Sequence, residues 1–341
     1  MNVDIEASPG GDCEAFVLAR PEGNLAHTPR WHRMVVGASR NEGLYLVARR
    51  DGQVCGVLPM VHVRSRLFGN RMVSHGLSNY GGPLADGPET LDALYRRATE
   101  LAAQRRCEHI EFRNLHPMPY DLPELENKVC MYLPLPADPE PLWDSLKAKV
   151  RNQVRKAEKS GIVSFCGGAE LLEEFYGVYV TRMHQLGTPC YSRETFGLMM
   201  EGMGDLFRIF VVRKDDLAVG AGITCCFKGL AEIPYASTLV EFNSLCPNNL
   251  LYWSILKHYC QAGAKTFDFG RSTIDAGTYQ FKKQWGAEPV ALHYQFWLPE
   301  GGKLELANPD SPKYRRKVEM WKKLPAWLAN WLGPKLSRSL P

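Results

Sequence analysis

The chain has 341 residues, of which 45% are hydrophobic and 23% are charged, a composition typical of a soluble globular protein of about two domains. It contains no run of about 18 apolar residues, so we expect no membrane-spanning helix, and the acidic first residues do not fit a signal peptide. The ten cysteines lie in apolar stretches without a CxxC pair, which favours buried thiols in a reducing cytoplasm. His27 and His32 lack companion ligands, so we expect no metal.

The net charge of +4 is unevenly distributed along the chain. Residues 147–159 carry a net charge of +5 and residues 311–341 carry +7, so the remainder is acidic. Two basic segments on an acidic body favour anionic partners, such as phosphate groups, nucleic acid or a membrane surface.

Two similar stretches predict β-hairpins in the two halves of the chain. Residues 47–57 (VARRDGQVCGV) alternate around a polar turn at Asp51, and residues 211–221 (VVRKDDLAVGA) align with them without a gap, 164 residues later. The matching positions include Gly56 and Gly220. This pattern favours a duplicated domain, although any two hairpins share some of these features.

The segment SNYGGPLAD (residues 78–86) is a candidate ligand contact in the first half. Its paired glycines allow close approach of the backbone to a ligand, and a purely structural turn is the alternative. We name Asn79 and Tyr80 as candidate substrate-binding residues. Residues 93–103 then predict a helix, and residues 109–115 predict a strand.

A proline-rich stretch, LPLPADPEPLW (residues 133–143), predicts neither a helix nor a central strand. We therefore predict a first domain over residues 1–145 and a second over residues 146–310. Residues 311–341 form a basic segment that contains Trp321, Trp327 and Trp331. We expect this segment to be helical and to pack back on the first domain, with a membrane surface as the alternative.

Residues 146–160 predict an amphipathic basic helix at the start of the second domain. Lys147, Arg151, Arg155 and Lys159 follow one another at i, i+4 spacing, and the opposite face carries Leu146, Val150, Val154 and Ala157. The basic stripe is either a solvated face or a docking surface for phosphate, for which Arg151 and Arg155 are the candidates.

The rest of the second domain predicts helices over residues 170–186 and 248–263, the latter with Asn248 as a possible cap and Gly263 as its end. A strand, TFDFG (residues 266–270), follows directly. Its alternation places Phe267 and Phe269 on one face and Asp268 on the other. This mixture of helices and hairpins indicates an α+β or α/β fold.

The residues after this strand are the best candidates for chemistry. Arg271 and Ser272 lie at the end of the strand, a common position for site residues. Lys282 lies between Phe281 and Trp285, and a partly desolvated lysine acts strongly on developing negative charge. The chain has no GxSxG, Walker or GxGxxG motif, and it lacks the Gln/Arg-x-x-Gly-x-Gly/Ala loop expected of an acetyltransferase that uses coenzyme A.

Four segments together resemble the FemAB-like family, in the branch associated with exosortase/PEP-CTERM exopolysaccharide systems: AKVRNQVRKAEKSG, NYGGPLAD, PNNLLYW and FDFGRSTIDAGTYQFKKQWGA. The resemblance implies two tandem GNAT-like domains, each a mixed twisted sheet flanked by helices. Such relatives transfer an amino acid from aminoacyl-tRNA to an amine of a peptidoglycan precursor, without a metal. Their transfer-site motif matches Phe281, Lys282, Trp285 and Gly286, and their basic interdomain helix matches residues 151–159.

We therefore expect an acyltransferase that acts on an anionic, small-molecule or lipid-linked glycan precursor of the cell envelope or of an exopolysaccharide. Lys282 would stabilise the tetrahedral oxyanion, and Tyr279 is a further catalytic candidate. No residue stands out as base: Asp268 and Asp275 are candidates, and the alternative is a substrate amine that enters already neutral. Arg271, Ser272, Phe281 and Trp285 would bind substrate. The donor is aminoacyl-tRNA or acyl-CoA, and no tightly bound cofactor is expected. The alternatives are an acyl-CoA-dependent enzyme acting on a glycan and a non-catalytic protein that binds RNA or the inner face of the membrane.

Overall fold

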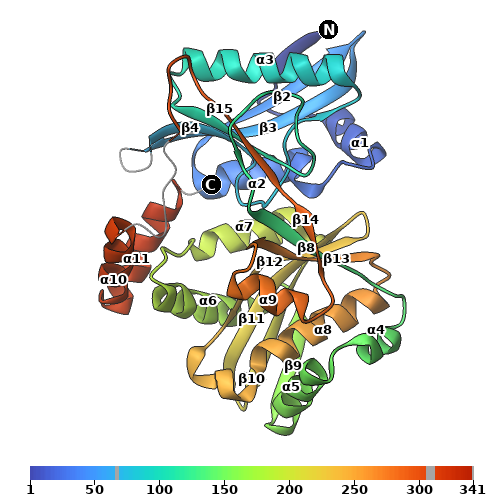
Figure 1. Cartoon of the computed structure of the whole chain (residues 1–341), viewed down its shortest axis with the longest axis vertical. Helices are drawn as coiled ribbons and strands as arrows, with labels where there is room; N and C mark the ends of the chain where they lie inside the picture. Colours follow the sequence, from blue (N-terminus) through green and yellow to red (C-terminus); the bar gives the residue numbers. More distant parts are fainter. Residues whose placement is uncertain (66–68, 305–311, 340–341) are drawn as a thin grey trace. The chain divides into compact units, whose positions relative to one another are not determined.

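The computed structural model describes residues 1–65, 69–304 and 312–339, and its contacts divide the chain into two compact units (Figure 1). The first unit comprises Met1–Lys128, Ala291–Ala307 and Lys335–Pro341, and the second comprises Val129–Val290 and Asn308–Pro334. The first boundary therefore precedes the predicted one at residue 145, because Leu133 and Leu142 pack in the core of the second unit. The predicted boundary at residues 310 and 311 lies outside the described residues.

The first unit is a mixed sheet with helices packed against it. Its strands follow the order β1 (Asn2–Ile5), β2 (Glu42–Arg50), β3 (Gln53–Ser65), β4 (Gly69–Ser74), β6 (His109–Asn114), β15 (His293–Trp297) and β7 (Glu124–Leu125), and β5 (Leu84–Ala85) pairs with β3. Its helices are α1 (Gly11–Ala19), the short 3-10 helix Leu25–His27, α2 (Pro29–Ser39) and α3 (Pro88–Gln104). The pairing of β4 with β6 is parallel, while β2, β3 and β4 pair antiparallel.

The second unit repeats this architecture. Its sheet has the order β14 (Glu288–Ala291), β8 (Lys128–Pro134), β13 (Thr266–Thr273), β12 (Leu230–Thr238), β11 (Leu217–Phe227), β10 (Phe207–Lys214) and β9 (Ile162–Gly167). Its helices are α4 (Pro139–Ser145), α5 (Ala148–Lys159), α6 (Leu172–Leu186), α7 (Arg193–Met203), α8 (Pro247–Gln261), α9 (Gly277–Lys283), and 3-10 helices at Ala169–Leu171, Gly204–Leu206 and Val240–Leu245. Two mixed sheets flanked by helices confirm the predicted fold class.

The two predicted hairpins are present and share an irregularity. The β2–β3 register shifts between Ala48 and Arg49, and the β10–β11 register shifts between Val212 and Arg213, again 164 residues apart. Both turns begin at an aspartate with positive φ, 51° at Asp51 and 54° at Asp215. A bulge at the same position of both hairpins supports the duplication more strongly than the turn residues alone, because a bulge inserts a residue at one defined place.

Two local predictions are wrong. The proline-rich stretch includes the helix α4, because Pro139 occupies its first position and the Asp138 side chain accepts a hydrogen bond from the Glu140 amide at 3.0 Å. Helix α8 begins earlier than predicted: Pro247 is its first residue, so Asn248 lies inside the first turn and does not cap it. In contrast, the amphipathic α5 buries Val150, Val154 and Ala157, as predicted.

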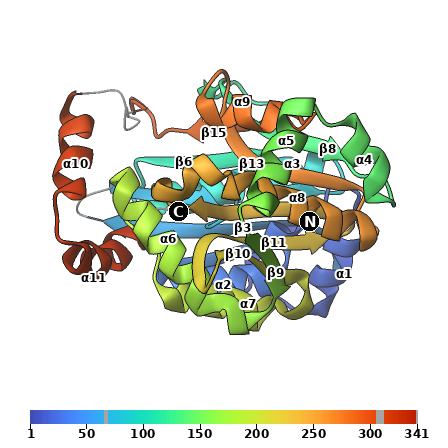
Figure 2. The same cartoon turned by 90° about the horizontal axis from the view of Figure 1, so that it is seen from below.

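The C-terminal helices are α10 (Pro312–Lys322) and α11 (Ala326–Ser337), drawn in red (Figure 2). Contrary to the prediction, α10 packs on α6 of the second unit, where Val318 contacts Gly187 and the His184 Nε2 lies 2.9 Å from the Leu324 carbonyl oxygen. Only the last described residues contact the first unit, through Asn41 and Arg71. Among the described helices, none is long and apolar enough to cross a bilayer.

Candidate active site

The candidate site lies in the second unit, where β12 and β13 separate. Their parallel pairing covers only residues 230–232 and 266–268, although β12 continues to Thr238 and β13 to Thr273. Beyond Glu232 and Asp268, the backbone N–H and C=O groups on the facing edges of the two strands therefore do not hydrogen-bond to each other and need other partners. Such a separation makes room for a polar side chain or a ligand between two strands of one sheet.

Two carboxyl groups lie side by side at the point where β12 and β13 separate. Glu232 and Asp268 are register partners, so their side chains project from the same face of the sheet. The buried Asp268 accepts a hydrogen bond from the Gly270 amide at 2.7 Å, and the Cys225 thiol donates to Glu232 at 3.0 Å. Burial, and then the neighbouring Asp268 carboxylate, raise the pKa of Glu232 to about 7. Glu232 can therefore gain or lose a proton near neutral pH.

The ammonium group of Lys282 lies near the second of these carboxyl groups, that of Asp268. Lys282 comes from α9 and donates hydrogen bonds to the carbonyl oxygens of Gly270 at 2.7 Å and Arg271 at 3.0 Å. Successive carbonyls of a regular strand point to opposite sides, and the φ of +76° at Gly270 breaks this alternation so that both face one ammonium group. Within the described residues these are its only acceptors, which leaves one N–H for a ligand.

The charge state of Lys282 follows from its surroundings. Its side chain is 7% exposed, and this burial lowers its pKa to about 8, an effect that the Asp268 carboxylate partly opposes. Lys282 is therefore mainly protonated at neutral pH but close to its titration range. We refer to Glu232, Asp268 and Lys282 as the carboxylate–lysine cluster.

Two buried cysteines complete the surroundings of this cluster. Burial, and then the carboxylate of Asp268 for Cys130 and of Glu232 for Cys225, hold the pKa values of these thiols well above the ordinary value. A thiol in this environment is not ionised at neutral pH and is a poor nucleophile. The cluster therefore offers a base and a cation rather than a covalent thiolate.

The other predicted residues of this segment differ in how far they are buried. Ser272 is buried, and its hydroxyl has no hydrogen-bond partner within the described part of the chain. Arg271 is exposed, and Tyr279 is buried with the Lys283 ammonium 5.7 Å from the centre of its ring. Asp275, the second predicted base, lies in an exposed turn with a φ of +64°.

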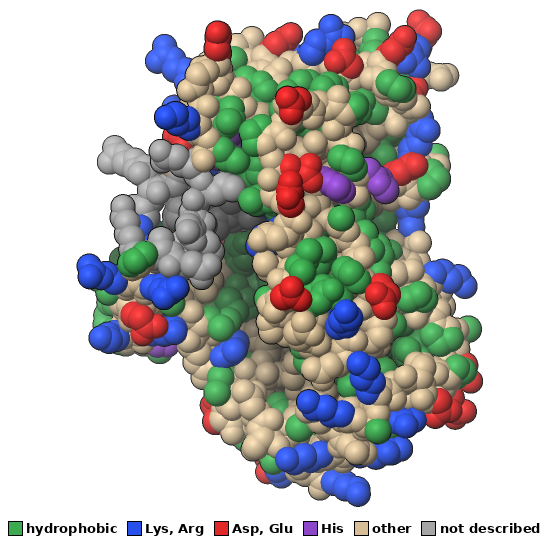
Figure 3. Space-filling view, viewed as in Figure 1, with side chains coloured by type: hydrophobic (Ala, Val, Ile, Leu, Met, Phe, Trp, Pro, Cys, Tyr) green, Lys and Arg blue, Asp and Glu red, His purple; other side chains and the backbone are tan. Residues whose placement is uncertain are grey.

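The basic helix α5 lies against α8, and its arginines already have partners. Arg151 lies 3.9 Å from the Asp144 carboxylate, and the Arg155 guanidinium lies over the Trp143 ring at 5.4 Å. Both interactions are at the surface, where an ion pair contributes about 0–1 kcal/mol and is easily exchanged for a phosphate. Lysines and arginines gather on the lower part of the face shown in Figure 3, where α5 lies in Figure 1.

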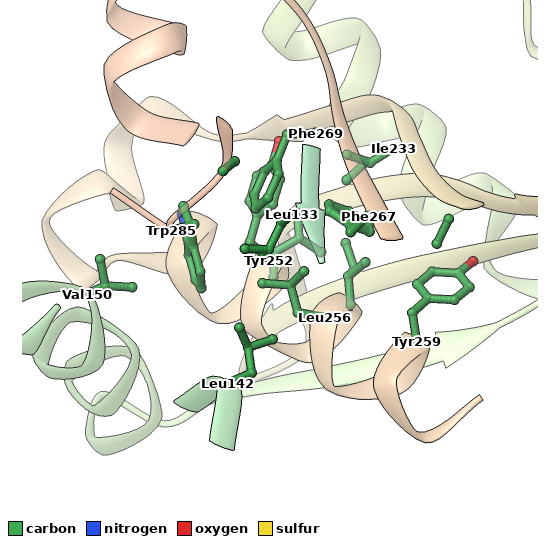
Figure 4. Packing of buried hydrophobic residues seen from close by; sticks show 14 of the residues in the cluster. Leu133, Leu142, Val150, Ile233, Tyr252, Leu256, Tyr259, Phe267, Phe269 and Trp285 are labelled. Atoms are coloured by element: carbon green, nitrogen blue, oxygen red, sulfur yellow. The ribbon is translucent and has the colours of Figure 1, made fainter. Parts of the chain in front are cut away.

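Phe281 and Trp285 belong mainly to the hydrophobic core. The Phe281 ring contacts Tyr252 edge-on at 5.2 Å, and Trp285 is 1% exposed. Figure 4 shows Trp285 among the core side chains that include Phe269 and Tyr252. Both rings therefore fix the position of α9, and with it Lys282, from the core side of the sheet.

Asn79 and Tyr80 lie in the first unit, in the loop that follows β4. The Tyr294 hydroxyl donates to the Asn79 carbonyl oxygen at 2.5 Å, and Tyr80 is buried. A Cβ atom at Gly81 would lie 1.7 Å from the His75 ring, so only glycine fits there. The glycine pair thus has a structural reason, independent of any ligand.

A separate surface pocket of about 510 Å³ in the second unit lies between α6 and β11. Its wall contains Arg213 and Glu174, which already form two hydrogen bonds of 2.7 Å with each other. None of the cluster residues lines it. Because Arg213 and Glu174 already pair with each other, we place the candidate active site at the carboxylate–lysine cluster and not in this pocket.

Comparison with protein families assigns the part of the chain that carries the cluster. Residues 144–283 match the family described as "Acetyltransferase (GNAT) domain". The structure titled FemX matches with a TM-score of 0.66 and 16% identity, over 86% of this chain and 97% of the FemX chain. Residues 144–283 therefore carry a GNAT acetyltransferase domain, and the chain has a fold similar to that of FemX.

Further solved structures have a similar fold. A tandem GNAT protein from the clavulanic acid biosynthesis pathway has a TM-score of 0.55 and 14% identity, over 89% of this chain and 99% of its own. The L-PGS structure from Bacillus licheniformis has a TM-score of 0.56 and 12% identity, over 94% and 99%. Comparison with curated proteins finds no match.

Lys282 and Asp268 were predictable from the sequence, whereas Glu232 was not. The missed signal is a single carboxylate inside the apolar strand sequence LAEIPYAST. A glutamate in such a strand is either at an exposed face or buried with a special partner. Whether Glu232 is exposed or buried depends on the pairing of β12 with β13, and no local sequence pattern specifies that pairing.

Proposed function

We propose that this enzyme transfers an aminoacyl group to an amine, or a hydroxyl, of a cell-envelope or exopolysaccharide precursor. The observation that carries the proposal is the buried Lys282 ammonium near Asp268, whose register partner across β12 and β13 is Glu232. A buried cation with one remaining N–H and a carboxyl group on the adjacent strand that titrates near neutral pH are suited to acyl transfer.

The reaction uses the cluster in two steps. In the first, the acceptor amine attacks the carbonyl carbon of the donor ester, and the ionised Glu232 takes the proton that the nitrogen loses. A C–N bond forms, and the new oxyanion accepts the remaining N–H of Lys282. In the second step the C–O bond of the ester breaks, and the leaving oxygen takes the proton from Glu232. Asp268 is a positioning residue that holds the Gly270 amide and favours the charged lysine.

The other predicted residues keep binding roles in this proposal. Arg271 and the α5 residues Arg151 and Arg155 would contact a phosphate of donor or acceptor, and Ser272 would contact the acyl group. Tyr279 remains a catalytic candidate. Asn79 and Tyr80 remain candidate substrate-binding residues of the first unit. The exposed position of Arg271 and the weak surface pairing of Arg151 support these roles.

The segment that would face the donor favours an aminoacyl ester over a CoA thioester. It runs from the 3-10 helix Val240–Leu245 into α8 and contains no glycine. Pro247 has no N–H, and the Asn249 amide already donates to the Cys246 carbonyl at 3.1 Å. Few amides therefore remain for a pyrophosphate. Acyl-CoA acting on a glycan stays the second candidate, because the matching family is described as an acetyltransferase domain.

The test compares two lysines of one helix. Lys282→Met should lower kcat by about 10²–10³, because the oxyanion loses a positioned donor. Lys283→Met, which removes the neighbouring exposed lysine, is the matched control and should leave kcat within about twofold. The full chain is assayed with envelope precursors as acceptors, and the appearance of deacylated tRNA or of free thiol identifies the donor. Equal activity of the two variants would exclude the proposed role of Lys282.

A further inference from the structure

The two C-terminal helices expose an unusual set of large side chains. Met320 is 70% exposed, Trp327 is 71% exposed and Trp331 is 59% exposed. Large apolar side chains are rarely left this open on a soluble surface without a partner that covers them. These residues all lie in the second unit, and the sequence around them, residues 311–341, carries a net charge of +7.

Packing on the opposite side fixes the outward direction of these residues. In α11, Ala329 is 2% exposed, and the backbone at Gly333 lies so close to Cys190 that a Cβ atom would be 2.8 Å from its sulfur. Trp327 and Trp331 are one helical turn apart and two positions away from these small residues, which places them on the opposite face. The tryptophans are therefore held outward by the fold.

Helix α10 likewise packs against the fold on one side and exposes a large side chain on the other. Val318 packs against Gly187 at the end of α6, where a Cβ atom at the glycine would lie 2.6 Å from it. Met320 is two positions further along the helix and points away from this contact. Arg316, which is exposed, lies one turn before it, and the exposed Lys323 lies in the turn that follows α10. We call the exposed residues Arg316 and Met320 of α10, Lys323 of the following turn, and Trp327 and Trp331 of α11 together the outer face.

The chemistry of the outer face matches one kind of partner. Indole rings prefer the boundary between water and lipid, because the ring is apolar and its N–H is polar. Lysine and arginine beside them match the negative surface of an anionic membrane, to which each cation adds about 1 kcal/mol. A face that interleaves both residue types is typical of helices that lie on a membrane without crossing it.

We propose that the outer face binds the surface of an anionic lipid bilayer. The chain then attaches peripherally, with α11 lying along the headgroups and the tryptophan rings inserted between them. The binding would place the enzyme where lipid-linked precursors are found, but it does not depend on the transfer chemistry. RNA is the competing partner for a basic surface, and it requires cations but gains little from Met320.

The experiment measures co-sedimentation of the full chain with vesicles of phosphatidylcholine, with and without phosphatidylserine. The chain should bind the anionic vesicles, and added salt should weaken the binding. Arg316→Gln with Lys323→Gln should weaken it about 30-fold, from two cations. Trp327→Ala with Trp331→Ala should weaken it about tenfold or more at constant charge.

Two controls separate this surface from the rest of the chain. Lys149→Gln with Lys156→Gln removes two exposed cations of α5, and Leu217→Ser removes an apolar side chain that is 51% exposed on β11. Both should leave vesicle binding within about twofold, since neither touches the outer face. Equal binding by the tryptophan variant and the parent, or no preference for anionic vesicles, would overturn the proposal. Loss of tRNA binding with unchanged vesicle binding in the outer-face variants would also overturn it.

Discussion

At the scale of single residues, the position of Lys282 has two consequences. Its ammonium satisfies two carbonyls of β13, and its remaining N–H is available to a ligand. Buried carbonyls that lose their donor cost about 1–3 kcal/mol each, so a substitution at Lys282 affects stability as well as activity. Lys282→Met must therefore be compared with its parent at a temperature where both are folded.

The pH dependence of kcat/KM is a direct test of the two assigned charge states. Glu232 must be ionised to accept a proton, so activity should rise as pH passes its pKa of about 7. Lys282 must be protonated, so activity should fall as pH passes its pKa of about 8. The expected profile is a narrow bell between these values. Glu232→Gln should keep little activity, and what remains should lack the acidic limb. A residual profile with the same acidic limb would assign that limb to another group.

Glu232 should also reduce stability in the pH range where the enzyme works. Folding raises its pKa from the ordinary 4.5 to about 7, so its contribution to stability is full below 4.5 and is lost as pH rises through 7. Glu232→Gln removes this loss and should be more stable than the parent at pH 8, by roughly 1–3 kcal/mol, but not at pH 4.5. Urea unfolding at both pH values measures the difference. An equal difference at the two values would contradict the assigned pKa.

At the scale of the element, strand β13 matters through its break in regularity. Phe267 and Phe269 were predictable as core residues and Asp268 as their opposite, because strand alternation is a local property. The orientation of the Gly270 and Arg271 carbonyls toward Lys282 was not predictable, since it depends on the positive φ of Gly270 and on the packing of α9 against β13. Glu232 was missed for the same reason, because its partner lies on another strand.

Gly270→Ala is the element-scale prediction. A Cβ atom at a φ of +76° costs about 1–2 kcal/mol, and relief of this strain would turn the Gly270 and Arg271 carbonyls away from Lys282. Both stability and kcat should therefore fall. Gly263→Ala is the matched control, since Gly263 has the same φ of +76° at the end of α8 and nothing within 4 Å of its Cβ position. It should lose similar stability and retain kcat, as thermal unfolding and steady-state assays would measure. Equal loss of kcat in both variants would remove the special role of Gly270.

At the scale of the whole molecule, the sequence predicted the tandem fold better than the division of the chain. The hairpins at residues 47–57 and 211–221 carry local turn and alternation signals, and both form. The boundary at residue 145 and the packing of the C-terminal segment depend on which distant elements meet. From the sequence, Leu133 could belong to the core of either unit. Only the pairing of β8 in the second sheet assigns it to the second unit.

Strand β15 gives the chain a constraint on the order in which it can fold. It forms after the whole second unit in the sequence, yet it lies between β6 and β7 of the first sheet, where it pairs over residues 110–114. During synthesis the first unit therefore waits with an open gap in its sheet until residue 297 has emerged from the ribosome. Until then the edges of β6 and β7 that β15 will cover are open to pairing with other chains, although this unit was made first.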